Sequence, residues 1–152
     1  MNTWFECKVR YTKAGENGSE KKVTELYLVD AMSFTEAEAR IIEEMRPFIG
    51  EGFKVTAIRI MNYSEWFPSD NLKDDKWYRV KANWITLDEK SGKEKKNGWY
   101  AIVQSSGTAE AEKHFHERMK GTLADYTIES VTETQLLDVY PYVTERETDE
   151  TR

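Results

Sequence analysis

The chain has 152 residues, of which 39% are hydrophobic and 33% are charged, and its formal net charge at pH 7 is −6. This composition is too apolar for a disordered chain, and no run of about 18 apolar residues predicts a membrane-spanning helix. The opening residues do not resemble a secretory signal. The single cysteine, Cys7, excludes an intramolecular disulfide framework and suits a reducing compartment. We therefore expect a cytoplasmic protein without membrane attachment.

The first third of the chain predicts a hairpin. Residues 4–11 alternate between apolar and charged side chains, which is typical of a half-buried strand. Residues 13–20 contain two glycines and an asparagine that favour a turn, and residues 23–30 are rich in strand-forming side chains.

A helix and a third strand are predicted next. Ser33 and Glu36 form a capping-box pattern, so a helix is expected over residues 34–48, ended by Pro47 and the glycines of 50–52. Its apolar stripe recurs every three or four residues and comprises Phe34, Ala37, Ile41, Met45 and Phe48. Residues 53–61 are predicted to form the third strand.

The same sequence of elements occurs a second time. Trp4–Val9 corresponds to Trp77–Ala82, and the closing segment Glu65–Pro68 corresponds to Asp138–Pro141, both at an offset of 73 positions. The charged triplet of residues 20–22 recurs at 94–96 with an offset of 74, so the second hairpin is one residue longer. Such ordered self-similarity predicts two copies of one structural unit.

We therefore predict an α+β fold made of two ββαβ repeats. Each repeat is expected to form a three-stranded antiparallel sheet of order 2-1-3, packed by one helix. The first repeat covers residues 1–68, a polar linker 69–76, and the second repeat 77–143. A helix over 108–120 carries the second apolar stripe, Ala111, Phe115, Met119 and Leu123. The polar tail 144–152 is expected to be disordered, and the repeats are expected to form one pseudo-symmetric body.

The two closing segments predict an extended structure. In each, an acidic residue precedes an aromatic residue and then a proline, as in Asp138, Tyr140 and Pro141. Because proline favours an extended residue before it, the aromatic side chain is expected to pack into its own repeat or the other one. An aromatic side chain displayed to a partner is the alternative.

No assembled catalytic or metal-binding set is apparent. His114 and His116 are the only histidines, and at a spacing of two on a helix they point to different sides. Cys7 falls among apolar strand residues, which favours a buried thiol over a nucleophile. We predict no catalytic residue, no metal and no cofactor. An enzyme that uses helix carboxylates with either histidine is the less favoured hypothesis.

Basic residues of the strands are the best candidates for a binding site. With two aromatic residues they could form a cationic face for a ligand or a nucleic acid. The competing interpretation is that the lysines protect strand edges and the aromatic residues fill the cores. The candidates are Lys8, Arg10, Lys21, Lys22, Arg79, Lys81, Lys95, Lys96, Trp4 and Trp77.

Two functions follow from these candidates. The favoured one is a non-enzymatic binding protein that engages a protein partner or a small anionic ligand. The alternative is a nucleic-acid-binding protein, which the negative net charge disfavours. The sequence leaves the oligomeric state open.

Several segments together resemble a known family. They are Trp4–Tyr11, Tyr27–Ala31, Ser33–Ala39, Trp77–Tyr78, Leu87–Gly92 and Lys120–Thr122. Over residues 3–142 the chain resembles a family of uncharacterised small proteins, a domain of unknown function, from gut anaerobes and their phages and mobile elements. The resemblance implies no activity, cofactor or site residue. It implies a protein made from mobile DNA in the cytoplasm of a bacterial host cell, where small acidic proteins often act by binding host components.

Overall fold

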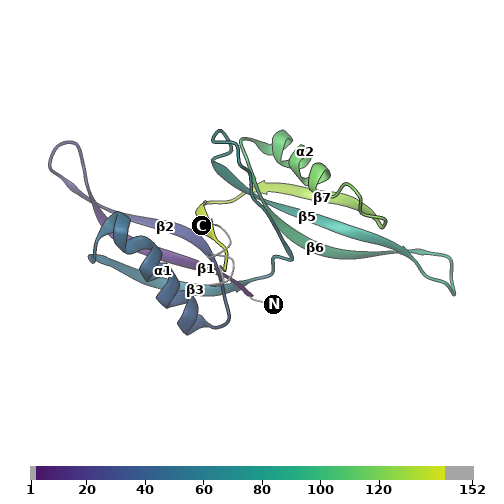
Figure 1. Cartoon of the computed structure of the whole chain (residues 1–152), viewed down its shortest axis with the longest axis horizontal. Helices are drawn as coiled ribbons and strands as arrows, with labels where there is room; N and C mark the ends of the chain where they lie inside the picture. The colour runs from purple at the N-terminus through teal and green to yellow at the C-terminus, as the bar shows by residue number, and fades with distance from the viewer. Residues whose placement is uncertain (1–2, 143–152) are drawn as a thin grey trace, which may run out of the picture. The chain divides into compact units, whose positions relative to one another are not determined.

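The computed structural model describes residues 3–142. These residues form two helices and eight strands, arranged as two four-stranded sheets with one helix each (Figure 1). The described residues divide into two compact units. Unit 1 contains residues 3–61 and 136–142, and unit 2 contains residues 62–135. The tail predicted for 144–152 lies outside the described residues.

Unit 1 is a mixed sheet with a helix on one face. Its strands lie in the order β3-β1-β2-β8, and β8 alone runs parallel to its neighbour. The elements are β1 (Thr3–Ala14), β2 (Glu20–Ala31), α1 (Phe34–Ile49), β3 (Phe53–Met61) and β8 (Leu136–Tyr140).

Unit 2 has the same plan. Its strands lie in the order β4-β6-β5-β7, and here β4 is the parallel strand. The elements are β4 (Glu65–Phe67), β5 (Lys76–Leu87), β6 (Glu94–Ser105), α2 (Thr108–Arg118) and β7 (Asp125–Glu133).

The predicted sheet of three antiparallel strands is present in each unit, but it is only part of the observed sheet. The order 2-1-3 is present as β2-β1-β3 and as β6-β5-β7, but each sheet has a fourth strand. That strand comes from a closing segment, and it adds in parallel to the outer edge of β2 or β6. Unit 1 receives the segment that follows β7, whereas unit 2 receives the segment that follows β3. Each sheet is therefore built from both halves of the chain.

The pairing register is the same in both units. Val139 lies opposite Leu28, and Trp66 lies opposite Ile102, at positions that correspond under the sequence offsets. The register between the first and third strands shifts after Lys8 in unit 1 and after Lys81 in unit 2. Corresponding side chains therefore occupy corresponding places, which allows the two units to be compared residue by residue.

Each unit has its own hydrophobic core between helix and sheet. Ala37, Ile41 and Met45 of α1 are buried, as predicted from their spacing, against the odd-numbered residues of β1 and β2. In unit 2 Phe115 is fully buried and lies 5.8 Å from the ring of Phe67 in β4. The outer members of both predicted stripes are exposed, namely Phe34, Phe48 and Leu123.

The ends of α1 differ slightly from the prediction. Its first turn is capped as expected, because the backbone N–H of Glu36 donates to Ser33 Oγ at 3.1 Å. Pro47 lies inside the last turn, and the helix ends at Ile49 with Gly50 as its C-cap, whose φ of 70° suits glycine. In unit 2, α2 ends at Arg118, two residues before the predicted end at Lys120.

Candidate anion-binding face

Four basic residues share one face of the unit 1 sheet, on the side opposite α1. Arg10 lies directly opposite Lys54 of β3, and it is diagonal to Lys22 of β2, which pairs with Thr12. Lys8 lies two residues before Arg10 and therefore points to the same side. All four side chains are exposed. We call Lys8, Arg10, Lys22 and Lys54 the cationic face.

Within residues 3–142 no ion pair neutralises the charges of the cationic face. Like charges opposite each other on a sheet repel, so the Arg10 and Lys54 pair is unfavourable without a counter-ion. Together with Lys22 these two residues line a hollow of about 270 Å³. The hollow is large enough for a small anion.

The corresponding face of unit 2 is neutralised. Lys81, which corresponds to Lys8, forms an ion pair of 3.0 Å with Glu129. Glu129 is the extra residue at the register shift of β7, and its counterpart in unit 1 is the neutral Thr56. The hydrogen bond from Lys81 lowers the pKa of Glu129, as expected for a carboxylate that contacts an ammonium group. Asn83 stands where unit 1 has Arg10 and contacts the same carboxylate at 3.5 Å.

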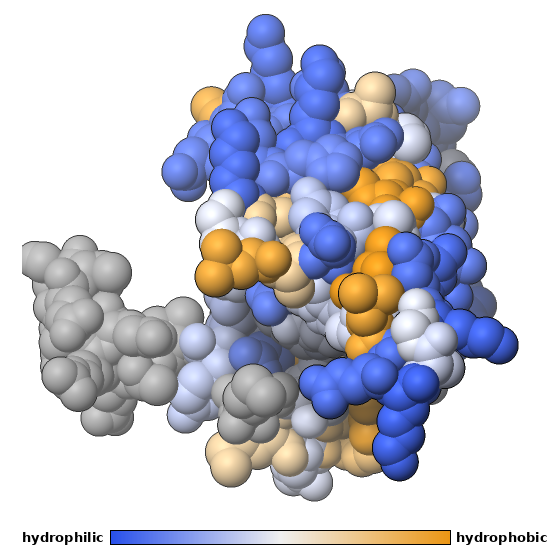
Figure 2. Space-filling view, turned by 90° about the vertical axis from the view of Figure 1, so that its right-hand side faces the viewer, coloured by the Kyte–Doolittle hydropathy of each residue, from blue (hydrophilic) through white to orange (hydrophobic). Residues whose placement is uncertain are grey.

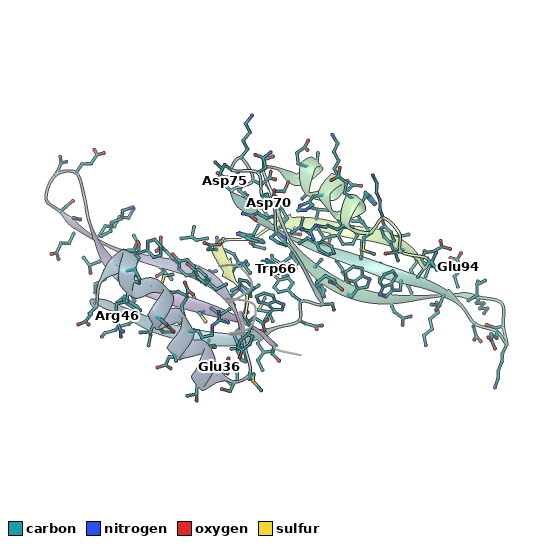
Figure 3. The ribbon with its side chains drawn as sticks, viewed as in Figure 1. Glu36, Arg46, Trp66, Asp70, Asp75 and Glu94 are labelled. Atoms are coloured by element: carbon teal, nitrogen blue, oxygen red, sulfur yellow. The ribbon has the colours of Figure 1, made fainter. Side chains whose placement is uncertain are left out.

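The other predicted basic residues are not part of this cluster, because Lys21 lies on the other side of β2 from Lys22, and Arg79, Lys81, Lys95 and Lys96 belong to unit 2. Lys21, Lys95 and Lys96 are exposed near the hairpin ends of β2 and β6, where Glu94 also lies (Figure 3). The guanidinium of Arg79 and the ammonium of Lys81 each lie 5.9 Å from the centroid of the Tyr100 ring. Lys54 was not among the predicted residues, and because its counterpart in the second repeat is Thr127, the repeat itself gives no signal at this position.

The two predicted aromatic platforms are not displayed to solvent in the same way. Trp77 has 3% of its surface exposed, and Trp4 is half-buried. Trp4 lies on the same side of β1 as Lys8 and Arg10, between Asp30 of β2 and Met61 of β3. Stacking of a base on Trp77 would therefore require that ring to be uncovered.

The side chains considered for catalysis make contacts within unit 2 or lie in the unit 1 core. His114 Nδ1 is 2.8 Å from the carbonyl oxygen of Gln104, and His116 Nδ1 is 2.6 Å from the hydroxyl of Tyr126. Cys7 is fully buried, and burial raises the pKa of its thiol to about 12. No group of three metal-ligating side chains occurs within residues 3–142.

A larger hollow lies between α1 and β3 but has a balanced lining. It measures about 590 Å³ and is lined by Glu38 and Glu51 as well as by Arg46 and Lys54. Arg46 projects from α1 (Figure 3). Because two acidic and two basic side chains line it, the hollow has no clear preference for the charge of a ligand.

Exposed charge alone does not mark a site in this protein. Figure 2 shows one face on which hydrophilic side chains surround smaller hydrophobic patches. With one third of all residues charged, lysines are expected on every surface. The cationic face is distinguished because its four residues form no ion pair within residues 3–142, whereas Lys81 of unit 2 is paired with Glu129.

These features define a small α+β protein with two similar units and a candidate anion site on one of them. The chain belongs to the family described as a domain of unknown function, DUF4494, whose model matches residues 3–142. None of the curated proteins matches the chain. Neither helix in the described part of the chain is long and apolar enough to cross a bilayer.

Proposed function

We propose that this protein is a non-enzymatic binding protein whose cationic face holds a small anion with several charged oxygens. The observation that carries this proposal is the difference between corresponding positions. Unit 2 has Glu129 beside Lys81, whereas unit 1 has Thr56 beside Lys8, and its four cations form no ion pair within residues 3–142. The anion is either a free ligand or a group presented by a host protein, since both offer the same chemistry.

The electrostatic argument favours a multiply charged ligand. Placing Arg10, Lys22 and Lys54 around one hollow costs free energy in the empty protein, and an anion that contacts all three converts this repulsion into attraction. The lysines act as point charges and Arg10 can bind an oxyanion through two N–H groups. Because the face is exposed, its attraction for anions falls as salt screens it.

The experiment is a calorimetric titration of the full chain with tripolyphosphate at low and at physiological salt. Saturable binding that weakens with salt is expected. The variant Thr56→Glu places a carboxylate beside Lys8, as in unit 2, and should weaken binding by about tenfold, which is ~1.4 kcal/mol. Lys54→Glu should weaken binding at least as much.

Lys96→Glu is the matched control, because Lys96 is the unit 2 counterpart of Lys22. Its affinity should stay within about twofold of the wild type. Equal losses in Lys96→Glu and Lys54→Glu would show a general charge effect and contradict the site. No binding of tripolyphosphate at low salt would contradict the proposed function as a whole.

Nucleic-acid binding is the second candidate. The observation in its favour is that the four cations extend across three adjacent strands, which is a surface that could follow a phosphate backbone. A titration of a single-stranded oligonucleotide at increasing salt separates the two. If four phosphates are contacted, log K should fall against log salt with a slope of about −3. Absence of affinity at low salt removes this candidate.

The two units are further proposed to derive from tandem duplication of one ββαβ module. Support comes from the matching strand registers, the matching register shift after Lys8 and Lys81, and the matching placement of the closing strands. Superposition of residues 4–68 on 77–141 in an experimental structure tests this, and different connectivity would refute it.

A cytoplasmic location in a bacterial host, with an origin in phage or mobile DNA, completes the proposal. The single, fully buried Cys7 is compatible with a reducing compartment. Fractionation of cells that express the tagged protein tests the location, and recovery in the periplasm would contradict it.

A further inference from the structure

A third hollow in unit 1 also lies on the helix side of the sheet, and its chemical character is opposite to that of the cationic face. It measures about 310 Å³ and is bounded by β1, β2, β8 and the last turns of α1. Its lining includes Tyr11, Glu25, Tyr27, Phe48, Asp138 and Tyr140. No lysine or arginine is part of this lining. The hollow is therefore distinct from the cationic face in both position and charge.

Aromatic rings form one wall of this hollow. The rings of Tyr27 and Tyr140 are stacked, with centroids 6.0 Å apart and an interplanar angle of 25°. Tyr27 is 8% exposed, whereas Phe48 is 78% exposed and lies at the rim. Ring faces of this kind attract organic cations, because the face of an aromatic ring carries partial negative charge.

Two carboxylates add full negative charge. The Tyr27 hydroxyl donates to Glu25 Oε1 at 3.2 Å, and Asp138 lines the same hollow from β8. Within residues 3–142 neither carboxylate forms an ion pair. Burial, followed by the charges of Asp138 and Glu44, raises the pKa of Tyr140 to about 12, as expected where the local potential is negative.

Unit 2 carries indole rings at two positions that correspond to residues lining this hollow. Trp99 occupies the position of Glu25, and Trp84 occupies that of Tyr11. The two indole rings stack at 5.1 Å with an angle of 21°, and Trp99 also packs 5.6 Å from Phe115. Indole rings thus replace a carboxylate and a tyrosine at these positions, so the acidic character of this pocket is specific to unit 1.

We propose that the pocket around Glu25, Tyr27 and Tyr140 binds an alkyl cation, which is an ammonium or guanidinium group at the end of a short apolar chain. The cationic head lies against the tyrosine rings and the Glu25 carboxylate, where charge and ring face both attract it. The alkyl chain of the ligand lies along the apolar side chains of α1, which include the nearly fully buried Met45. The ligand is either a free amine or a lysine or arginine side chain of a partner.

The test is an NMR titration of the full chain with n-butylammonium and n-butylguanidinium, with n-butanol and butyrate as neutral and anionic counterparts. Saturable shifts of unit 1 resonances are expected with the cations only. Glu25→Gln, which preserves size and removes the charge, should weaken binding about tenfold. Glu25→Trp, which copies Trp99 of unit 2, should abolish it.

Glu89→Gln is the control, because Glu89 is an exposed carboxylate in the turn of the second hairpin. Its affinity for butylammonium should equal that of the wild type. Tyr140→Leu provides a second variant if Glu25→Trp does not fold, and it should weaken binding by removing a ring face. Capped lysine and arginine amides identify a side-chain ligand when they bind as well as the free cations.

Three results would overturn the proposal. They are no saturable binding of either cation, equal binding of n-butanol, and unchanged affinity in Glu25→Gln. None of these bears on the cationic face, because tripolyphosphate binding depends on residues of the opposite side of the sheet.

Discussion

Cys7 shows how burial of one titratable side chain should affect stability. It lies in the centre of β1 with no exposed surface, and burial raises its thiol pKa from 9.0 to about 12. The folded protein therefore holds this proton in a pH range where the unfolded chain releases it. Between about pH 9 and about pH 12, the free energy of unfolding should fall as pH rises, by up to about 1.4 kcal/mol per pH unit from this group.

The measurement is urea unfolding between pH 8 and pH 10.5, for the wild type and for Cys7→Ala. The variant loses stability at every pH because a buried sulfur is removed, but its curve should be flatter above pH 9. Parallel curves for the two proteins would show that the Cys7 thiol does not contribute to alkaline destabilisation.

At the scale of elements, the first turns of the two helices form a natural comparison. Ser33 caps α1 with its side chain, whereas the corresponding residue of α2 is Gly107, which provides no side-chain hydrogen bond. Both residues have extended backbones, and a Cβ added at Gly107 meets no atom within 4 Å. Gly107→Ser should therefore stabilise the protein by about 0.5 to 1 kcal/mol.

Ser33→Ala should have the opposite effect and destabilise by about 1 kcal/mol. Both changes are measured by chemical denaturation at pH 7, with Gly107→Ala separating the gain in backbone rigidity from the capping bond. A stability of Gly107→Ser equal to that of Gly107→Ala would contradict the capping explanation.

Local patterns were enough to predict most of the secondary structure. Alternation in residues 4–11 and the spacing of Ala37, Ile41 and Met45 identify β1 and α1, because one buried face imposes these periods. The pairing of β4 and β8 was not predicted. Strands as short as Glu65–Phe67 carry little periodicity, and a parallel partner in the other repeat is a long-range choice that local sequence does not encode.

The candidate site was predicted only in part, for a different reason. Several predicted residues occur in both repeats, such as Lys22 and Lys96. The proposed sites lie where the repeats differ, at Thr56 and Glu129 on one face and at Glu25 and Trp99 on the other. A comparison of recurring residues therefore does not point to them.

At the scale of the whole molecule, each closing strand, β4 or β8, pairs with a strand from the other half of the chain. We therefore predict that the two halves stay associated after the chain is cut between them. A protease site inserted between Leu72 and Lys73 lies in the loop after β4, where Leu72 is 99% exposed. After cleavage, the halves should stay together on gel filtration, because β4 remains paired with β6 and β8 with β2.

The control for this experiment carries Phe67→Asp and Val139→Asp, which place charges at two buried positions of the closing strands. These changes should allow the cleaved halves to separate. Separation of the unmodified halves without denaturant would show that strand pairing does not hold them.

The position of β8 also affects the order in which the protein matures on the ribosome. Domains commonly fold as they emerge, N-terminal parts first. The sheet of unit 1 lacks β8, the strand that pairs with β2, until Leu136–Tyr140 has been translated. In contrast, every strand of the unit 2 sheet has been made once Glu133 is added. Unit 1 is therefore begun first and completed last. A premature stop codon before Leu136 would leave β2 as an unpaired edge strand that can pair with other chains and aggregate.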